Sequence, residues 1–331
     1  MIRSGTEAAA IEEAARALAA GELVAFPTET VYGLGADAGS DAAVAKIFAA
    51  KGRPSDHPLI VHVPDAAAVP LFASEVPDFA QKLMQAFWPG PLTLILPRRE
   101  GMACAAAGGH STIGLRCPAH PVAHALLLAC SRSEPPVRGL AAPSANKFGR
   151  VSPTTAEHVR QEFEDGLLVL DGGPCRVGIE SSIVDCTRGA PVLLRPGILT
   201  IEQLQAACGR PLRMPHELDE PAPRASGTLE SHYAPRARVR LMDARSLQKA
   251  LDVLGADAAN IATYSRAILQ TRSAKVLRRR MPDDAGETAR QLFAVLREFD
   301  AQGAQLIWIE TPPDVPEWAG VRDRLQRASA G

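Results

Sequence analysis

Two cations stand two residues apart near the end of an expected helix, at Lys51 and Arg53. An arginine offers a planar fork of donors to phosphate oxygens, and a lysine offers a compact charge. The flanking Pro54 and a glycine-rich loop expected upstream at 33–35 favour a shaped phosphate site. The alternative is a solvated helix end, because the helix dipole also favours cations there.

A polar turn lies upstream of these cations, directly after an apolar strand. Thr28, Glu29, Thr30 and Tyr32 supply hydroxyls and a carboxylate that suit a small zwitterion or a ribose. A turn capped by its own side chains would use the same residue types. The spacing alone leaves both interpretations open.

A second cluster of small and polar residues lies at 141–154. Ala142, Ser144 and Asn146 allow close backbone approach and supply donors, which suits a phosphate or an adenine edge. Ser152 follows in the same stretch. An ordinary loop of turn-forming residues is the alternative here.

Three further segments place polar residues at the ends of expected strands. Thr112 and Arg116 bound one segment, Ser182 begins another, and Arg195 ends the third. The two arginines, with the two cations described above, would balance most of the charge of a triphosphate if all four converge on one cleft. Their convergence depends on the fold.

Several common catalytic patterns are absent from the sequence. It has no Walker loop, no HExxH or CxxC metal motif, and no G-x-S-x-G elbow. A catalytic metal held by the protein is therefore not expected. His57 and His62 flank an apolar strand, where a hydrogen-bonded core histidine is the simpler interpretation for His62. The six scattered cysteines are expected to pack as small apolar side chains in a reducing compartment.

The composition is that of an ordinary globular protein. The 331 residues are 46% hydrophobic and 22% charged, with no apolar run long enough to span a membrane. The amphipathic, acidic N-terminal segment is unlike a secretory signal or a transit peptide, so a cytoplasmic protein is expected. The net charge is −5 over residues 1–220 and +4 over 221–331, which is weak support for RNA binding by the second half.

The elements that must position these residues alternate along the chain. Short aliphatic runs, such as 59–63 and 92–96, alternate with helical segments such as 8–20 and 121–130. Residues 209–236 hold five prolines and no periodic apolar face, so they predict a linker. We therefore expect an α/β domain at 1–208, a proline-rich linker at 209–236 and a smaller α/β domain at 237–331.

Taken together, these segments resemble the YrdC-like family in its long two-domain form. The family signature, K-x-R followed far downstream by S-x-N, corresponds to Lys51-Gly-Arg53 and Ser144-Ala-Asn146. The supporting blocks match in order: PTETVYGLG, KGRP with HPLIVHV, FWPGPLTLIL, IGLRCP, APSAN, GIESSIVD, LLRPG and HYAP. Eight ordered blocks over about 8–235 are far more specific than one short motif.

The resemblance implies a twisted, open mixed sheet of the YrdC-like fold with a smaller Rossmann-like α/β domain. It also implies a nucleotidyltransferase that makes L-threonylcarbamoyl-AMP from L-threonine, bicarbonate or CO2, and ATP, with release of pyrophosphate. This is the first step of threonylcarbamoyladenosine modification of tRNA. A carbamate would attack the ATP α-phosphate in a basic cavity, and a separate threonylcarbamoyl transferase complex would act downstream.

The resemblance also assigns roles by position. Lys51, Arg53, Ser144 and Asn146 correspond to the catalytic motif. The threonine and carbamoyl group would be surrounded by Thr30, His62, Thr112, Arg116, Ala142 and Ser182. The nucleotide contacts would be Arg53, His57, Ser144, Ser152, Arg195, His232 and Tyr233. Mg²⁺ would arrive with ATP rather than on dedicated carboxylates.

Two rival functions belong to other classes. A protein of this fold could bind RNA or serve ribosome maturation through phosphate contacts. The sequence lacks aromatic-rich RNA-binding motifs, so RNA binding is the secondary hypothesis, and weak tRNA binding is left open. A carbamoyl-transfer module of a larger maturation protein would carry acylphosphatase and zinc-finger segments, which are absent.

The sequence departs from the family pattern at the linker. Members usually have Ser-Pro-Gly, whereas this chain has Ser226-Gly227 without the proline. We expect this change to loosen the hinge, while the HYAP block is intact.

Overall fold

The computed structural model describes residues 1–163, 166–218, 223–229 and 231–331. These residues divide into two compact units. The first unit holds residues 1–148 and 152–228, and the second holds 149–151 and 229–331. The division falls inside the predicted linker, of which residues 219–222 and 230 lie outside the described residues.

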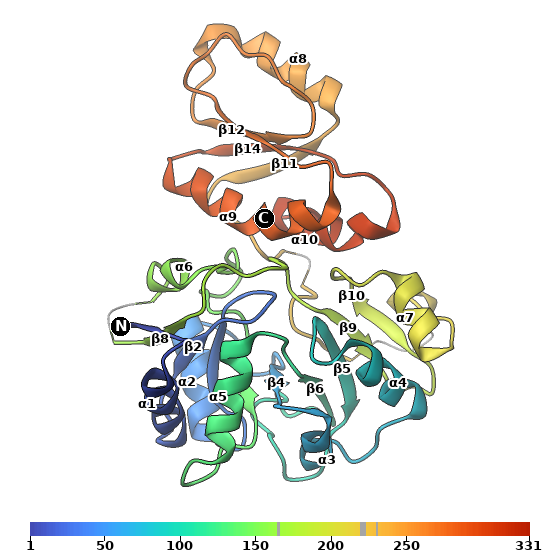
Figure 1. Cartoon of the computed structure of the whole chain (residues 1–331). Helices are drawn as coiled ribbons and strands as arrows, with labels where there is room; N and C mark the ends of the chain where they lie inside the picture. The colour runs from blue at the N-terminus through green and yellow to red at the C-terminus, as the bar shows by residue number, and fades with distance from the viewer. Residues whose placement is uncertain (164–165, 219–222, 230) are drawn as a thin grey trace. The chain divides into compact units, whose positions relative to one another are not determined.

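The first unit is built on one mixed sheet (Figure 1). Within the described residues, its strands follow the order β1-β8-β2-β3-β7-β4-β6-β5-β9-β10. They are β1 (Ile2–Ser4), β2 (Val24–Phe26), β3 (Gly33–Asp37), β4 (Ile60–His62), β5 (Leu92–Pro97), β6 (Thr112–Arg116), β7 (Leu140–Ala141), β8 (Leu168–Asp171), β9 (Ser182–Asp185) and β10 (Val192–Arg195). Since β4 runs parallel to β6 and antiparallel to β7, the predicted mixed sheet is confirmed.

Helices cover this sheet, and their apolar faces account for their places. They are α1 (Ala8–Ala19), α2 (Asp41–Lys51), α3 (Val69–Phe72), α4 (Asp78–Phe87), α5 (Pro121–Ser131), α6 (Ala156–Arg160) and α7 (Ile201–Cys208). Along β2, Val24 and Phe26 join the apolar cluster under α1 and α5, whereas Ala25 joins a different cluster that includes α2 and α4. Alternate residues of a strand point to opposite faces, so both faces of the sheet are buried.

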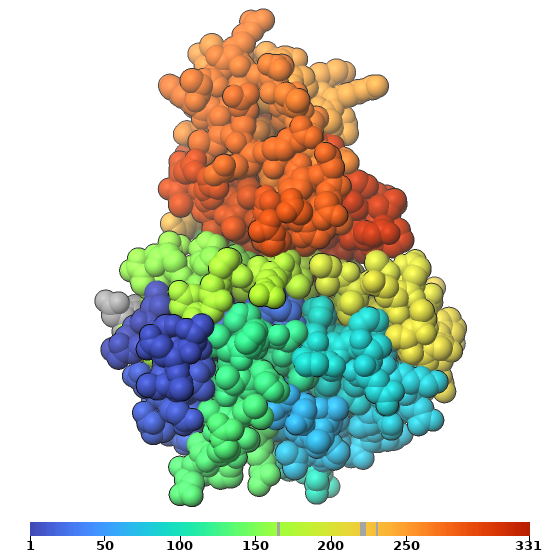
Figure 2. All heavy atoms as spheres, viewed as in Figure 1, coloured from blue at the N-terminus to red at the C-terminus, as the bar shows by residue number. Residues whose placement is uncertain are grey.

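The space-filling view shows how side chains close over the sheet on one side. In Figure 2, atoms of α1 (dark blue) and α5 (green) cover strands on the visible side of the first unit. The alanine-rich face of α1, with Ala14 and Ala15 buried, allows it to pack closely against Leu126 and Leu127 of α5.

One local prediction was wrong. The expected glycine-rich loop at 33–35 is strand β3, paired antiparallel with β2. The glycines are needed because the Phe26 ring lies across this strand: a Cβ at Gly35 would stand 2.8 Å from the ring, far closer than real carbon atoms approach. They serve strand packing rather than a phosphate loop.

The second unit is a smaller sheet whose strands are all parallel. Within the described residues its order is β11-β14-β12-β13. The strands are β11 (Arg238–Met242), β12 (Ile261–Ser265), β13 (Leu277–Arg280) and β14 (Leu306–Glu310), and the helices are α8 (Ala244–Leu254), α9 (Ala285–Ala301) and α10 (Ala319–Ser329). Figure 1 shows α8 on one face and α9 and α10 on the other. This arrangement confirms the predicted second α/β fold.

Two further expectations can be compared with the structure. All six cysteines are free thiols, and all but Cys104 are buried, as expected for packing residues. Burial raises the pKa of Cys117 to about 11. Among the helices in the described part of the chain, none combines the length and the apolar character needed to cross a bilayer.

Candidate active site

A buried ion pair lies where the polar turn after β2 meets the end of β6. Arg116 Nη2 donates to Glu29 Oε1 at 2.6 Å, and Arg116 Nη1 donates to Thr30 Oγ1 at 2.8 Å. The second Glu29 oxygen accepts from the backbone N–H of Ala119 at 3.1 Å. Both side chains are at most 10% exposed. Buried charges persist in this way only when paired and hydrogen-bonded, so the guanidinium is held in a fixed place and orientation.

His62 lies beside this pair. It is in parallel register with Arg116 on the neighbouring strand, so the two side chains share a face of the sheet. Burial, with a smaller contribution from the Arg116 charge, lowers the pKa of His62 to about 3. The imidazole is therefore neutral at physiological pH.

A buried hydroxyl lies at the start of β9. Ser182 is fully buried, and its Oγ makes no hydrogen bond to the described residues. Gly197, after β10, passes so close that a Cβ there would lie 2.7 Å from this Oγ. Since an unsatisfied buried hydroxyl costs free energy, Ser182 is suited to a ligand contact.

Arg53 and Arg195 both reach the same linker residue, Ser226. Arg53 Nη2 donates to Ser226 Oγ at 3.2 Å, and Arg195 Nη1 donates to its carbonyl oxygen at 2.8 Å. Ser226 Oγ in turn donates to Pro58 O at 2.8 Å. Despite the missing proline, these contacts attach the linker to the first unit and bring two of the four predicted cations together.

Arg195 also organises the hydroxyl residues at the start of β9. Its Nε donates to Ser181 O at 3.0 Å and its Nη2 to Ser181 Oγ at 3.2 Å. Ser181 Oγ lies 2.8 Å from Thr93 Oγ1 on β5. The arginine is thereby fixed next to Ser182.

Lys51 joins the two halves of the family signature directly. Its Nζ donates to the carbonyl oxygens of Ser144, at 2.6 Å, and Asn146. The backbone is linked as well, since Phe148 N donates to Lys51 O at 2.9 Å. Burial, reinforced by the nearby Arg53 charge, lowers the pKa of Lys51 well below its usual range. The Lys51 side chain therefore holds the loop at 144–146 and does not point into solvent.

The remaining predicted contacts of the first unit lie around these groups. The His57 ring packs edge-on against Phe148 at 5.5 Å, and Arg53 lies 5.7 Å from the same ring. Burial and Arg53 lower the pKa of His57. Ser152 is buried and donates to the Glu180 carboxylate. Ala142 is buried and donates its N–H to Ile60 O at 2.9 Å.

Two residues are not brought to the Arg116 cluster. Thr112 begins β6, four residues from Arg116, which separates them by about 13 Å along the strand. It lines a different pocket with His110 and Arg188. The Tyr32 hydroxyl donates to Gly173 O at 2.8 Å and lies 3.2 Å from Asp171 Oδ1, so it has a structural role.

His232 and Tyr233 belong to the second unit, where Tyr233 has an unusual backbone. Its φ of 62° lies in the left-handed region, which an aromatic residue rarely adopts. The ring stacks on Phe293 of α9 at 5.5 Å, and the buried guanidinium of Arg324 on α10 lies 5.2 Å from its centroid. His232 N donates to Arg327 O at 3.3 Å. Helices α9 and α10 therefore hold the HYAP block in its conformation.

Two residues of this network, Glu180 and Thr93, were not predicted as site residues, and Glu29 was predicted only as part of the polar turn. Glu29 stood in the polar turn, and only its pairing with a buried arginine shows its role. Thr93 is the single hydroxyl residue in the apolar run LTLIL, and this isolated polar residue is the sequence feature that could have pointed to it. Glu180 directly precedes Ser181 and Ser182.

Known proteins resemble this chain along nearly its whole length. Residues 16–197 match a family described as "Telomere recombination", and residues 199–330 match one described as "Threonylcarbamoyl-AMP synthase, C-terminal domain". The threonylcarbamoyl-AMP synthase of Pyrococcus abyssi is 37% identical to this chain, and the match covers 99% of this chain and 96% of that protein. The threonylcarbamoyl-AMP synthase of Bacillus subtilis is 38% identical, and the match covers 97% of this chain and 93% of that protein. A crystal structure of P. abyssi Sua5 complexed with L-threonine superposes with a TM-score of 0.87, at 36% identity over 96% of this chain and 94% of that one.

A match along nearly the full length, in both sequence and fold, covers both units of the chain. The chain belongs to the threonylcarbamoyl-AMP synthases, a family of nucleotidyltransferase enzymes.

Proposed function

We propose that this chain synthesises L-threonylcarbamoyl-AMP from L-threonine, bicarbonate or CO2, and ATP, with release of pyrophosphate. The observation that carries the proposal is the buried cluster of Arg116, Glu29 and Thr30. Its fixed guanidinium suits the carboxylate of an amino acid, and a related structure holds L-threonine. The buried Ser182 hydroxyl suits a further polar contact to the same substrate.

The chemistry asks the protein for positioning and charge neutralisation. The threonine amine adds to CO2 and loses a proton, giving a carbamate. A carbamate oxygen then forms a bond to the α-phosphorus of ATP, the bond from that phosphorus to the bridging oxygen breaks, and pyrophosphate leaves. Alignment of the reactants can supply about 7–11 kcal/mol of the barrier, and fixed cations stabilise the charge that develops.

Arg53 and Arg195 are the proposed phosphate-binding cations of the first unit. They share Ser226, so a single linker residue sets their spacing. His57, Ser144 and Ser152 remain the further nucleotide contacts that we propose here. Mg²⁺ bound to ATP would neutralise part of the triphosphate charge, with no carboxylate cluster required of the protein.

Lys51 is proposed to act by shaping the Ser144–Asn146 loop. Its two hydrogen bonds go to carbonyl oxygens of that loop, and its low pKa reflects burial. Asn146 is itself only 1% exposed. Loss of the lysine would therefore release the S-x-N motif from the K-x-R helix.

The C-terminal domain is proposed to hold His232 and Tyr233 ready for the nucleotide. A left-handed tyrosine persists only when its surroundings impose that conformation, and Phe293 and Arg324 provide them. We further propose that the product passes to a cytoplasmic threonylcarbamoyl transferase complex that modifies tRNA.

The test is product formation from radiolabelled bicarbonate, threonine and ATP, followed with pyrophosphate release. Lys51→Ala and Arg53→Ala should each lower turnover at least about 100-fold, a loss typical of a removed positioning or charge-stabilising group. Lys46→Ala is the matched control, because Lys46 lies on the same helix and pairs with the exposed Glu22.

Wild-type turnover in either variant would remove its residue from the catalytic role. If the unmodified chain makes no labelled nucleotide but binds RNA, the RNA-binding alternative replaces the synthase.

A further inference from the structure

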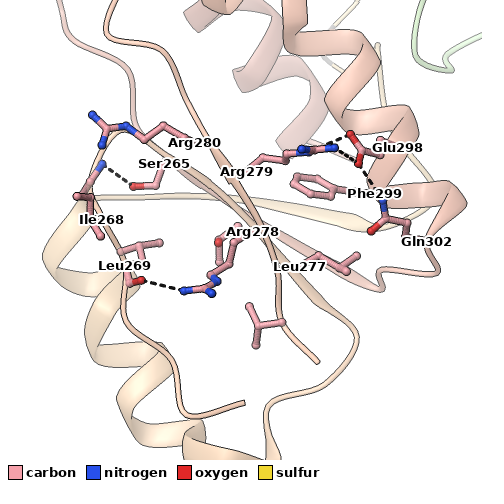
Figure 3. A pocket seen from close by; sticks show the side chains of 13 residues that line it. Ser265, Ile268, Leu269, Leu277, Arg278, Arg279, Arg280, Glu298, Phe299 and Gln302 are labelled. Atoms are coloured by element: carbon pink, nitrogen blue, oxygen red, sulfur yellow. Dashed lines mark hydrogen bonds and ion pairs between the residues drawn. The ribbon is translucent and has the colours of Figure 1, made fainter. Parts of the chain in front are cut away.

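The second unit contains a pocket of its own at the edge strand β13. Its volume is about 560 Å³, within the range of small-molecule sites. The walls come from the loop after β12, from β13 and from α9 (Figure 3). All the lining residues belong to the second unit, so this pocket is separate from the active site of the first.

The pocket carries an excess of positive charge. The described residues that line it include three arginines, Arg278, Arg279 and Arg280, and one carboxylate, Glu298. Arg279 is committed to that carboxylate through Nε–Oε2 at 3.1 Å and a second, shorter contact. Figure 3 shows the pair on the α9 side of the strand. The other two arginines do not bond to this carboxylate in the described part of the chain.

Arg278 and Arg280 share the opposite face of β13, because they stand two residues apart in a strand. Arg278 makes a long 3.4 Å contact to Leu269 O. Arg280 pairs with Asp283 at 3.2 Å, but both side chains are more than half exposed, and such pairs contribute little. Thr263 and Ser265 lie in register beside them on β12. Two guanidinium groups and the Thr263 hydroxyl therefore line one face, whereas the Ser265 hydroxyl donates to Glu310.

The loop after β12 already binds an anion from within the protein. The Glu310 carboxylate accepts from the backbone N–H groups of Arg266, at 2.8 Å, and Ala267, at 3.0 Å, and from Ser265 Oγ at 2.7 Å. Glu310 takes up these donors, and the loop lies at the carboxyl ends of parallel strands, where ligands bind in such sheets. The open pocket continues from this loop along Ile268 and Leu269.

An apolar wall completes the site. Leu269 and Val276 line it, and Ile268 stands 77% exposed at its rim, whereas Leu277 and Phe299 lie on the α9 side of β13. A large exposed aliphatic side chain next to a polar pocket is suited to contact the flat face of a ring. Phosphate donors beside an apolar wall match a phosphorylated small molecule with a planar base.

We propose that this pocket binds a nucleotide, with its phosphates on Arg278 and Arg280 and its base against the apolar wall. These arginines could instead have one of two other roles, and each predicts a different binding result. If they only protect the sheet edge from pairing with another strand, the pocket binds no ligand. A surface for RNA phosphates would bind an oligonucleotide in preference to a mononucleotide.

The test is hydrogen–deuterium exchange of the full-length chain with ADP as the probe, since it reports where the ligand binds. ADP should slow exchange in 266–280, separately from any protection in the first unit. Arg278→Gln with Arg280→Gln should raise the ADP concentration for half-protection by about ten-fold or more. Arg240→Gln, an exposed arginine on the opposite edge strand β11, should leave it unchanged.

Threonine-dependent pyrophosphate release should persist in the double variant, so that loss of the pocket is distinguished from loss of the active site. Inorganic pyrophosphate should give weaker protection of the same residues if the base contributes. The proposal is overturned if millimolar ADP gives no protection there, if the double variant is protected equally, or if a single-stranded RNA protects where ADP does not. Whether ADP protects residues 266–280 of the wild-type chain tests the proposal even if the double variant fails to fold.

Discussion

His62 is a residue whose burial has a measurable consequence for stability. Its pKa of about 3 in the folded protein lies below the usual value near 6.5. Between these values the unfolded chain binds a proton that the folded chain does not, so the free energy of unfolding falls as the pH falls below about 6.5. The slope from this residue approaches about 1.4 kcal/mol per pH unit.

Replacing His62 with Gln should remove that slope. Urea unfolding at several pH values between 6.5 and 4 will measure this. The free energy of unfolding should fall less steeply with falling pH for His62→Gln than for the wild type, because unfolding of the variant takes up about one proton fewer. His216→Gln, at an exposed histidine, is the control and should keep the wild-type slope. Equal slopes for the wild type and His62→Gln would mean that the imidazole is protonated inside the fold.

At the scale of elements, α10 presents a fully buried arginine to the HYAP block. Arg324 Nη1 donates to Asp323 Oδ2 at 2.6 Å, and Asp323 is also held by Arg327 Nε at 3.0 Å. Arg324→Met removes the cation over Tyr233 but leaves Asp323 paired with Arg327, so it should cost about 2 kcal/mol of stability. We expect KM for ATP to rise at least several-fold, with KM for threonine nearly unchanged.

Steady-state kinetics at a temperature where the variant is folded will measure the two KM values separately. Arg324→Lys should recover part of the ATP affinity, since a cation can still lie over the ring. Arg290→Gln on α9 is the control, because that arginine is exposed and pairs with the exposed Glu287. A uniform loss of activity without a change in either KM would show a role in stability alone.

At the scale of the whole molecule, the two units are expected to contribute to different steps. A chain that ends after Tyr233 keeps the Arg116 cluster but loses Phe293 and Arg324. Threonine should still raise the melting temperature of this truncated chain, because ligand binding to the folded state stabilises it. ATP-dependent pyrophosphate release should be lost. Full activity of the truncated chain would assign the second unit to partner binding instead.

Much of this arrangement could be predicted from local sequence. Alternating aliphatic and helical segments gave the α/β class, since strand and helix periodicities are local properties. The K-x-R and S-x-N motifs were recognisable because their residue types and order identify a family. The error at Gly33 and Gly35 has a physical cause: glycine is typical of loops, but here the Phe26 ring on the adjacent strand excludes any side chain.

The sequence by itself determined the class of fold, the family and the residue types available for chemistry. Only the tertiary structure decided which of them meet. Glu29 reaches Arg116 across 87 positions, and Ser226 reaches Arg53 across 173. Such pairings follow from strand order and register across a mixed sheet, which no local pattern specifies. The pocket at β13 is of the same kind, because its arginines gain a ligand-sized space only where the loop after β12 and helix α9 fold beside them.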